Sequence, residues 1–464
     1  MPINPIEIKN APIEYKKYFE VADMTPELGG NGNGTIDTQE EAEAAVGICQ
    51  KDCGDLKFYL KYHQFQISVG NDYVSLFERR LNNARELSDP KHKAMALSEI
   101  ACSMGVAGVG EKQVIAVFKE ALIIVKNIKN PDDKADAISN IAVAMVKTGF
   151  FQEALRSVGL IEGSKDRAYA FGSVALEMAK VGLSKEIVLK AFIDAIKTTK
   201  KMKNSSAKAI LLKDLAIKMI AAGVRKEEIE TVLQDSFEYL QDAFGSLQDA
   251  LGSKSSVRYV FAANHCKEIA VEMAKVGLDK ETILTVFEYA LDIANYIDRP
   301  DRPVLATYIY EEIAVEMANA GLNKDIISIV FLDSLSMAKT CFYADESDHF
   351  LPRIALEIVS AKLGKENTTK LLKRCLDVAR NMEKPSLLSS VLNNIAVAMI
   401  KAGLGKEEAG LVFEEAFNVA RTIYSWDEKG TAIRAVASAM TEVGYTEIEI
   451  DALFSAARLK SPEK

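Results

Sequence analysis

A glycine and a methionine recur together about every 41 residues along most of the chain, and the methionine always stands four residues before the glycine. The glycines are Gly108, Gly149, Gly182, Gly223, Gly277, Gly321, Gly403 and Gly444. The methionines are Met104, Met145, Met178, Met219, Met273, Met317, Met399 and Met440. A unit of this length is too small to bury its own apolar face. A repeat in this range therefore predicts helical units that stack on one another in a solenoid.

Each unit begins with a helix that a glycine ends. In the unit from Ala137 to Gly149, the apolar residue Ile141 lies four residues before Met145, so both project from one face of the helix. We call this apolar position the anchor. An alanine follows every anchor and lets a neighbouring helix approach closely, and a glycine eight residues after the anchor can take the left-handed conformation that ends a helix. The anchors are Ile100, Ile141, Val174, Leu215, Ile269, Ile313, Ile354, Ile395 and Val436.

A second helix follows the glycine turn in each unit. It begins with Lys-Glu or a similar pair, as at Lys280-Glu281, and the acidic residue in its first turn suits the helix dipole. It then carries a phenylalanine and a small residue three positions later, as at Phe287 and Ala290. We expect this phenylalanine and the methionine of the first helix to form the core.

Three units depart from the regular spacing. Only 33 residues separate Gly149 from the next repeat glycine, which shortens the second helix there to 153–160. After Gly223 the spacing is 54 residues, which predicts an insertion near 237–256. Lys362 stands where the repeat has glycine.

The repeat also extends backwards from its first clear unit. Phe77 continues the phenylalanine spacing, so a diverged second helix is expected at 72–87 and its first helix at 56–65. The sequence thus predicts a solenoid over 55–460, preceded by a small helical cap over 1–54. The predicted fold is all-α: a right-handed solenoid of about nine helix pairs.

The unit around Gly149 resembles a known family, the tetratricopeptide repeats. That family has a Leu-Gly pair, an aromatic residue, a second glycine and an alanine of the second helix at set spacings. The residues at those spacings here are Ile141-Ala142, Met145, Gly149, Phe151 and Glu153-Ala154. Other units have longer second helices, closer to HEAT-type repeats, and the family's signature tryptophan and terminal proline are missing. The resemblance covers about 55–460 and implies an architecture in which the first helices line a concave groove.

Residues 15–45 differ in composition from the repeats, and part of them resembles an EF-hand loop. Oxygen ligands alternate through a Gly-Asn-rich turn, Ile36 is placed for a short β contact, and Glu40 has the bidentate position. The first ligand position falls on Gly29, so Asp23 can serve only if 24–30 bulges out. The alternative is a simple turn between two helices. The candidate calcium ligands are Asp23, Asn31, Asn33, Thr35, Asp37 and Glu40.

Composition excludes several classes of function. A net charge of −9 and a pI near 5.3 argue against partners such as nucleic acid or an anionic membrane, and no run of 18 apolar residues predicts a membrane span. No phosphate-binding loop, nucleophile elbow or paired-carboxylate motif is visible, so we expect no enzyme activity and, calcium apart, no cofactor. The six scattered cysteines and the lack of a visible signal peptide favour a cytoplasmic protein.

The first helices carry a narrow polar stripe one residue before, three after and six after the anchor. If these helices line a groove, the stripe faces a partner, and Lys147, Lys180, Lys275 and Lys401 form a broken basic line within it. The alternative is a solvated face held by ion pairs such as Glu177/Lys180. The favoured function is a protein–protein scaffold that calcium modulates, and the rival is a sensor of a peptide or small ligand that changes the pitch of the superhelix. The candidate groove residues are Asn140, Lys147, Ser173, Lys180, Glu272, Lys275, Asn394 and Lys401.

Overall fold

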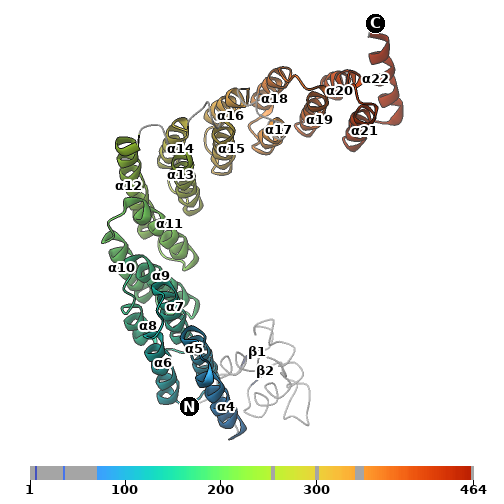
Figure 1. The fold of residues 1–464 in the computed structure, drawn as a ribbon. Coiled ribbons are helices and arrows are strands. Elements are labelled where there is room, and N and C mark those ends of the chain that lie inside the picture. Colours follow the sequence, from blue (N-terminus) through green and yellow to red (C-terminus); the bar gives the residue numbers. More distant parts are fainter. Residues whose placement is uncertain are drawn as a thin grey trace. The chain divides into compact units, whose positions relative to one another are not determined.

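The computed structural model describes residues 6–7, 35–36, 71–251, 256–297, 303–339 and 350–460. These residues are almost entirely helical (Figure 1), and the nine predicted helix pairs are present as α5/α6 to α21/α22 after a leading α4. In each pair we call the first helix, which carries the anchor, helix A and the second helix B. The bounds are α4 Asn71–Glu86, α5 Pro90–Val106, α6 Glu111–Val125, α7 Pro131–Lys147, α8 Phe151–Val158, α9 Ser164–Lys180, α10 Lys185–Lys200, α11 Ser205–Ala221, α12 Lys226–Leu251, α13 Ser256–Val276, α14 Lys280–Asn295, α15 Pro303–Asn319, α16 Lys324–Ala338, α17 Phe350–Ser360, α18 Lys365–Ala379, α19 Pro385–Lys401, α20 Lys406–Arg421, α21 Trp426–Glu442 and α22 Glu447–Lys460.

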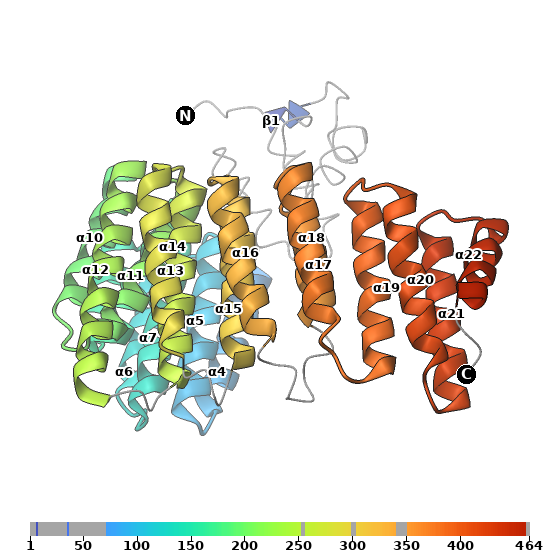
Figure 2. The same ribbon diagram turned by 90° about the horizontal axis from the view of Figure 1, so that it is seen from above.

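The chain forms two compact units. Unit 1 comprises Met1–Lys203 and Asp214–Arg225, and unit 2 comprises Asn204–Lys213 and Lys226–Lys464, so α11 contributes to both. Apart from α11, each helix A packs on its own helix B, and several also pack on the next helix A, as for α7 with α8 and α9, or α19 with α20 and α21. Figure 2 shows successive pairs of unit 2, from α13/α14 to α21/α22, side by side. The predicted all-α solenoid packing is therefore confirmed within the units.

The predicted core is also confirmed. Every anchor is at most 5% exposed and every repeat methionine at most 6%. Five helix B phenylalanines are fully buried, and the alanines after the anchors have no exposed surface except Ala437, which is partly exposed. The phenylalanines with no exposed surface are Phe118, Phe192, Phe287, Phe331 and Phe413.

The repeat glycines end each helix A in the left-handed conformation, with φ between +65° and +90°. The amide of the residue after each glycine donates to the carbonyl of the repeat methionine at 2.9–3.1 Å, which is the six-to-one bond of a Schellman cap. The spacing of four between methionine and glycine is thus the spacing that this cap requires. At the unit that lacks the glycine, Lys362 adopts φ +50° in its place.

The irregular spacings are absorbed by helix length. The short unit has an eight-residue helix B, α8, close to the predicted 153–160. The insertion near 237–256 lengthens α12, which runs to Leu251, and adds to the start of α13. Aromatic rings join these extensions, since Phe244 lies 5.8 Å from Tyr259 and 5.6 Å from Tyr296 between ring centroids.

The N-terminal cap is described only at one strand pair. β1 (Ile6–Glu7) pairs antiparallel with β2 (Thr35–Ile36), with Ile6 opposite Ile36. The predicted β contact of Ile36 is thus confirmed. Of the candidate calcium ligands, Thr35 lies in β2, and the other five lie outside the described residues, as does the helix predicted at 56–65. Those five are Asp23, Asn31, Asn33, Asp37 and Glu40.

Candidate functional site on the helix A face

An apolar row lies on the outward side of the helix A layer. The residue two after the anchor is apolar in all but the last unit, where it is Ser438, and most members of this row keep part of their surface in water. Ile217 on α11 is 39% exposed and Leu356 on α17 is 43% exposed. The apolar row consists of Cys102, Val143, Leu176 and Ile217 in unit 1 and of Val271, Val315, Leu356 and Val397 in unit 2.

The polar stripe predicted from the sequence borders this row. Lys147 on α7 and Lys401 on α19 are exposed. Lys180 lies 3.3 Å from Glu177, and Lys275 lies 2.8 Å from Glu272. The Glu177/Lys180 pair of the alternative interpretation is therefore present, as is a second pair at the same spacing, Glu272/Lys275.

Not every predicted groove residue offers surface to a partner. Glu272 is only 9% exposed and its carboxylate is held by Lys275. The Asn394 amide donates to the carbonyl of Ser390, 2.9 Å away on its own helix. Asn140 is exposed on α7.

Ser173 takes part in a contact between neighbouring repeats of unit 1. Its hydroxyl accepts a hydrogen bond from the Lys218 ammonium at 2.9 Å, and that ammonium lies 3.5 Å from the centroid of the Tyr169 ring. Burial in this contact lowers the pKa of Lys218 to about 8, against the opposing effect of Asp214. Lys218 on α11 and Ser173 on α9 thus join two helices A.

In unit 2 the position just before the anchor is occupied by ion pairs between repeats. We call this series the ladder: the residue two before one anchor pairs with the residue one before the next anchor. Lys267 pairs with Glu312 at 2.5 Å and Arg353 with Glu311 at 2.6 Å. The three pairs of the ladder are Lys213–Glu268, Lys267–Glu312 and Glu311–Arg353. The sequence placed Glu268, Glu312 and Arg353 in the polar stripe; their side chains are 40–48% exposed, and each is paired with the preceding repeat.

The most buried member of the ladder is Glu311. Its side chain is 2% exposed, and burial raises its pKa to about 7 although Arg353 acts in the opposite direction. Glu357 and Glu312 raise it further. This carboxyl therefore titrates near neutral pH.

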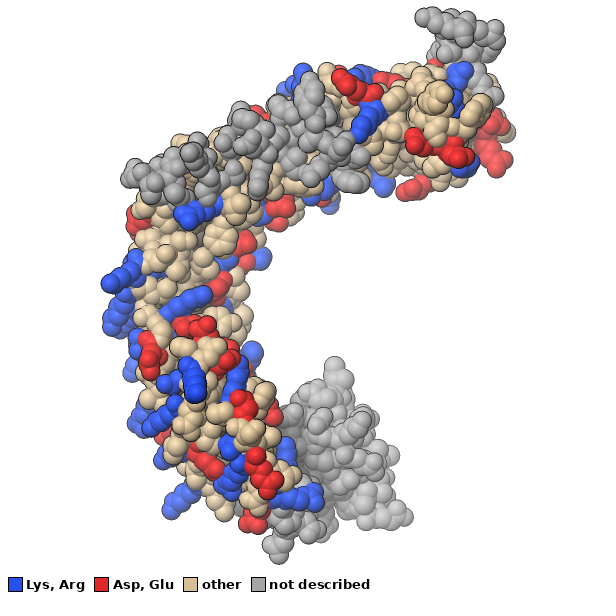
Figure 3. Space-filling view, in the orientation of Figure 1, with Lys and Arg blue, Asp and Glu red and all other residues tan. Residues whose placement is uncertain are grey.

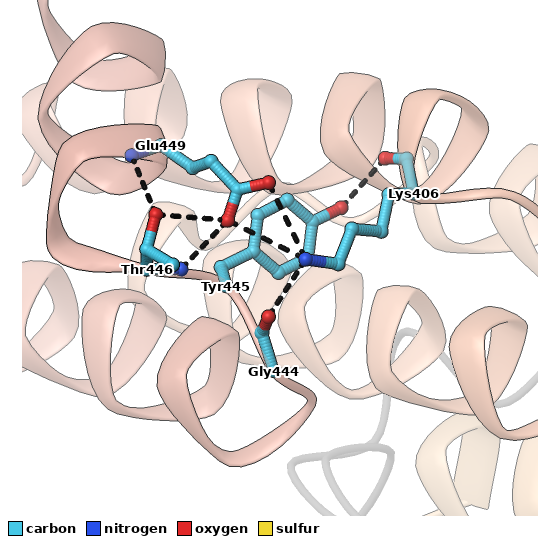
Figure 4. Close-up of polar contacts among 5 residues, drawn as sticks. All are labelled: Lys406, Gly444, Tyr445, Thr446 and Glu449. Atoms are coloured by element: carbon cyan, nitrogen blue, oxygen red, sulfur yellow. Dashed lines mark hydrogen bonds and ion pairs between the residues drawn. The ribbon is translucent and has the colours of Figure 1, made fainter.

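A second contact between repeats explains the lysine that opens many helices B. A cation in the first turn is unfavourable for its own helix dipole. Lys406, however, donates at 2.7 Å to the carbonyl of Gly444, at the C-terminal end of the next helix A, where a cation is favourable (Figure 4). The Tyr445 hydroxyl in turn donates to the carbonyl of Lys406 at 2.6 Å. Two more such bonds run from Lys226 to Gly277 and from Lys280 to Gly321.

Charges of both signs are mixed over the described residues of the visible face in Figure 3. Within the described part of the chain, His, Cys, Asp and Glu side chains form no cluster of three or more that could hold a metal ion. None of the described helices is both long and apolar enough to cross a membrane. The features that distinguish the helix A face are thus its apolar row and its bordering lysines.

Comparisons with known proteins found structural neighbours only. No protein-family model matches the chain, and no curated protein matches its sequence. Ton1535 from Thermococcus onnurineus NA1 is 18% identical over 79% of this chain and 97% of its own, with a TM-score of 0.26. A circular tandem repeat protein is 14% identical over 96% of this chain and 98% of its own, with a TM-score of 0.34. A signal transduction ATPase with a tetratricopeptide repeat sensor from Pyrococcus horikoshii is 14% identical over 91% of this chain and 72% of its own, with a TM-score of 0.24. At these TM-scores the likeness carries no argument about function.

Proposed function

We propose that this protein is a non-enzymatic helical-repeat scaffold that binds a protein or peptide segment along the apolar row of its helix A layer. The observation that supports this is the row itself. Most of its members keep part of their surface in water at the same position of successive repeats. Burying that surface on a partner is favourable by roughly 25 cal/mol per Å².

The shape of the segment follows from the repeat. Each helix A except α21 contributes one apolar side chain to the row, and Lys147 and Lys180 stand exposed beside it on adjacent helices A. A partner that contacts several members in turn presents its own side chains at intervals. An extended peptide or a helix edge with apolar and acidic residues fits this arrangement.

The test compares the two layers of the solenoid. Ile217→Asp and Leu356→Asp place a charge in the row, whereas Ile329→Asp on α16 and Leu411→Asp on α20 place one on helix B residues that are 57% and 66% exposed. Each variant and the unmodified chain are used to capture proteins from cells of the source organism, and bound proteins are quantified. Circular dichroism verifies that all four variants keep their helical content.

We expect a defined set of partners to be lost with the two helix A variants and retained with the two helix B variants. Loss with the helix B variants alone moves the binding surface to the other layer. Equal retention by all four variants removes the apolar row as the binding surface.

A further inference from the structure

A cavity of about 500 Å³ lies between α19 and α21 in unit 2. Ser386, Ser390 and Asn393 from α19 form one wall, and the first half of α21 forms the other. Hydroxyl, amide and carboxylate side chains line it together with Ala432, Ala435 and Val436, and the larger part of its exposed surface is apolar. Its size is within the range of sites that hold small ligands.

The cavity lies beyond the C-terminal end of the ladder, whose last pair is Glu311–Arg353. In the three pairs of the ladder, the residue two before an anchor meets a charged side chain one before the next anchor. The corresponding residues of α19 and α21 are Asn393 and Ala435, and both line the cavity. The alanine methyl group cannot form an ion pair, so the space that the Glu312 or Arg353 side chain fills in the ladder is left open beside Ala435.

One buried polar group in the cavity has no partner. Asn393 is 8% exposed, and its Oδ1 atom is buried without a hydrogen-bond donor. Buried acceptors in folded proteins are normally satisfied, so a donor in the cavity would satisfy Asn393 once its amide turns the oxygen toward the cavity. Ser389, just below it, has its hydroxyl committed to the carbonyl of Ala416 at 2.9 Å.

The charged groups around the cavity favour a cation. Asp427 and Glu428 line it from the first turn of α21. Of the nearby cations, Lys429 lies over the Trp426 ring at 5.1 Å. Arg434 donates to Thr431, itself a lining residue, at 3.2 Å, so one guanidinium of the chain already lies at the rim of the cavity.

We propose that this cavity binds a guanidinium group, which would donate to Asn393 and the serine hydroxyls and be neutralised by Asp427 and Glu428. The group takes the place that the Arg353 side chain has in the ladder, and its planar set of five donors suits a lining of acceptors. It can come from a free alkylguanidine or from an arginine side chain of a peptide. This site goes beyond the proposed scaffold function, because it needs no protein partner.

The experiment is calorimetry and thermal denaturation of the full chain with matched probes. Butylguanidine is compared with butylurea, its neutral isostere, and a capped Gly-Arg-Gly peptide is compared with Gly-Gln-Gly. We expect the guanidinium probes to bind and raise the melting temperature, and the neutral ones to do neither. A preference for the free alkylguanidine over the peptide, or the reverse, identifies the source of the group. Equal behaviour of charged and neutral probes overturns the proposal.

Two variants locate the binding. Ala435→Arg places a guanidinium in the cavity from α21 itself, as Arg353 does in the ladder, and should weaken butylguanidine binding at least tenfold. Ser438→Arg adds the same side chain at an exposed position of the same helix and should bind as the unmodified chain does. An Asp427→Asn, Glu428→Gln double variant should also lose at least tenfold, which keeps the test decisive if Ala435→Arg does not fold. Unchanged binding in the double variant, or equal loss with Ser438→Arg, contradicts the site.

Discussion

Met273 contributes to the repeat in two ways, through its buried side chain and through the backbone carbonyl that closes the following turn. Its side chain is 1% exposed between the helices of neighbouring repeats. Its carbonyl accepts the amide of Leu278 at 3.1 Å and closes the turn after α13. Only the side chain depends on the identity of the residue, so its substitution isolates the packing contribution.

Met273→Ala should therefore lower the free energy of unfolding by about 2–4 kcal/mol, because it leaves a cavity that rigid neighbouring helices cannot close. Urea denaturation followed by circular dichroism measures the change. Leu411→Ala, at a side chain that is 66% exposed, serves as control and should change the stability by less than about 0.5 kcal/mol. A similar small effect for Met273→Ala would mean that the methionines do not form the core.

Glu311 makes stability depend on pH near neutrality. Its pKa is raised from 4.5 to about 7 in the folded chain, so between these values the folded state binds a proton that the unfolded state does not. The free energy of unfolding should then increase as the pH falls from about 7.5 to 5, by an amount on the order of 1–3 kcal/mol. Urea denaturation at both pH values should show this increase in the unmodified chain and less of it in Glu311→Gln. Glu442→Gln, at an exposed residue of α21, should keep the full pH dependence, and equal dependence in all three proteins would exclude Glu311 as its source.

At the scale of the helix, the sequence predicted the elements and missed the contacts between them. The Met–Gly spacing predicted each end of helix A because a Schellman cap is local in sequence. The apolar residue that follows each glycine, such as Leu278 or Leu404, was an available signal of the same cap. The partners of Lys267 and Lys406 lie 45 and 38 residues away, at separations that vary from unit to unit, so no fixed spacing indicates them. The sequence did not indicate the cavity at Asn393 either. That cavity depends on the missing ion pair between α19 and α21, which are also distant in sequence.

The glycine turn can be tested with two substitutions of opposite expected effect. Gly403 has φ +75° and an added Cβ would meet no atom within 4 Å, so Gly403→Ala should cost only the conformational strain, about 1–2 kcal/mol. Gly245 lies inside α12 with equally open surroundings, and Gly245→Ala should stabilise the chain by about 0.5–1 kcal/mol. Thermal denaturation of both variants measures the difference, and a change of the same sign in both would contradict the left-handed turn.

At the scale of the whole chain, a regulatory role for the N-terminal cap rests on the sequence alone. If the loop at 31–40 binds calcium, millimolar calcium should raise the melting temperature modestly, because a ligand that binds only the folded state stabilises it. Glu40→Gln should abolish the rise by removing the bidentate ligand. Glu41→Gln, at the adjacent acid, should leave it intact. A melting temperature that calcium does not change in the unmodified chain would exclude the calcium site.

The exposed lysines of the helix A face are also a feature of the whole chain, because they are spread over successive repeats of an acidic protein. Lys147 and Lys180 are exposed on adjacent helices A of unit 1, and Lys119 and Lys190 are exposed on helices B of the same unit. Reversing either pair to glutamate changes the net charge by the same four units, from −9 to −13. Any difference between the two double variants therefore reports the position of the charge and not its total.

Once a partner has been captured, its affinity for both double variants can be measured over a range of salt concentrations. If an acidic or extended segment lies along the apolar row, Lys147→Glu with Lys180→Glu should weaken binding, most strongly at low ionic strength, where unscreened repulsion acts over about 10 Å or more. Lys119→Glu with Lys190→Glu should bind nearly as the unmodified chain does, and both variants should keep their helical content. Equal affinity of the two double variants would place the partner on another surface of the repeats.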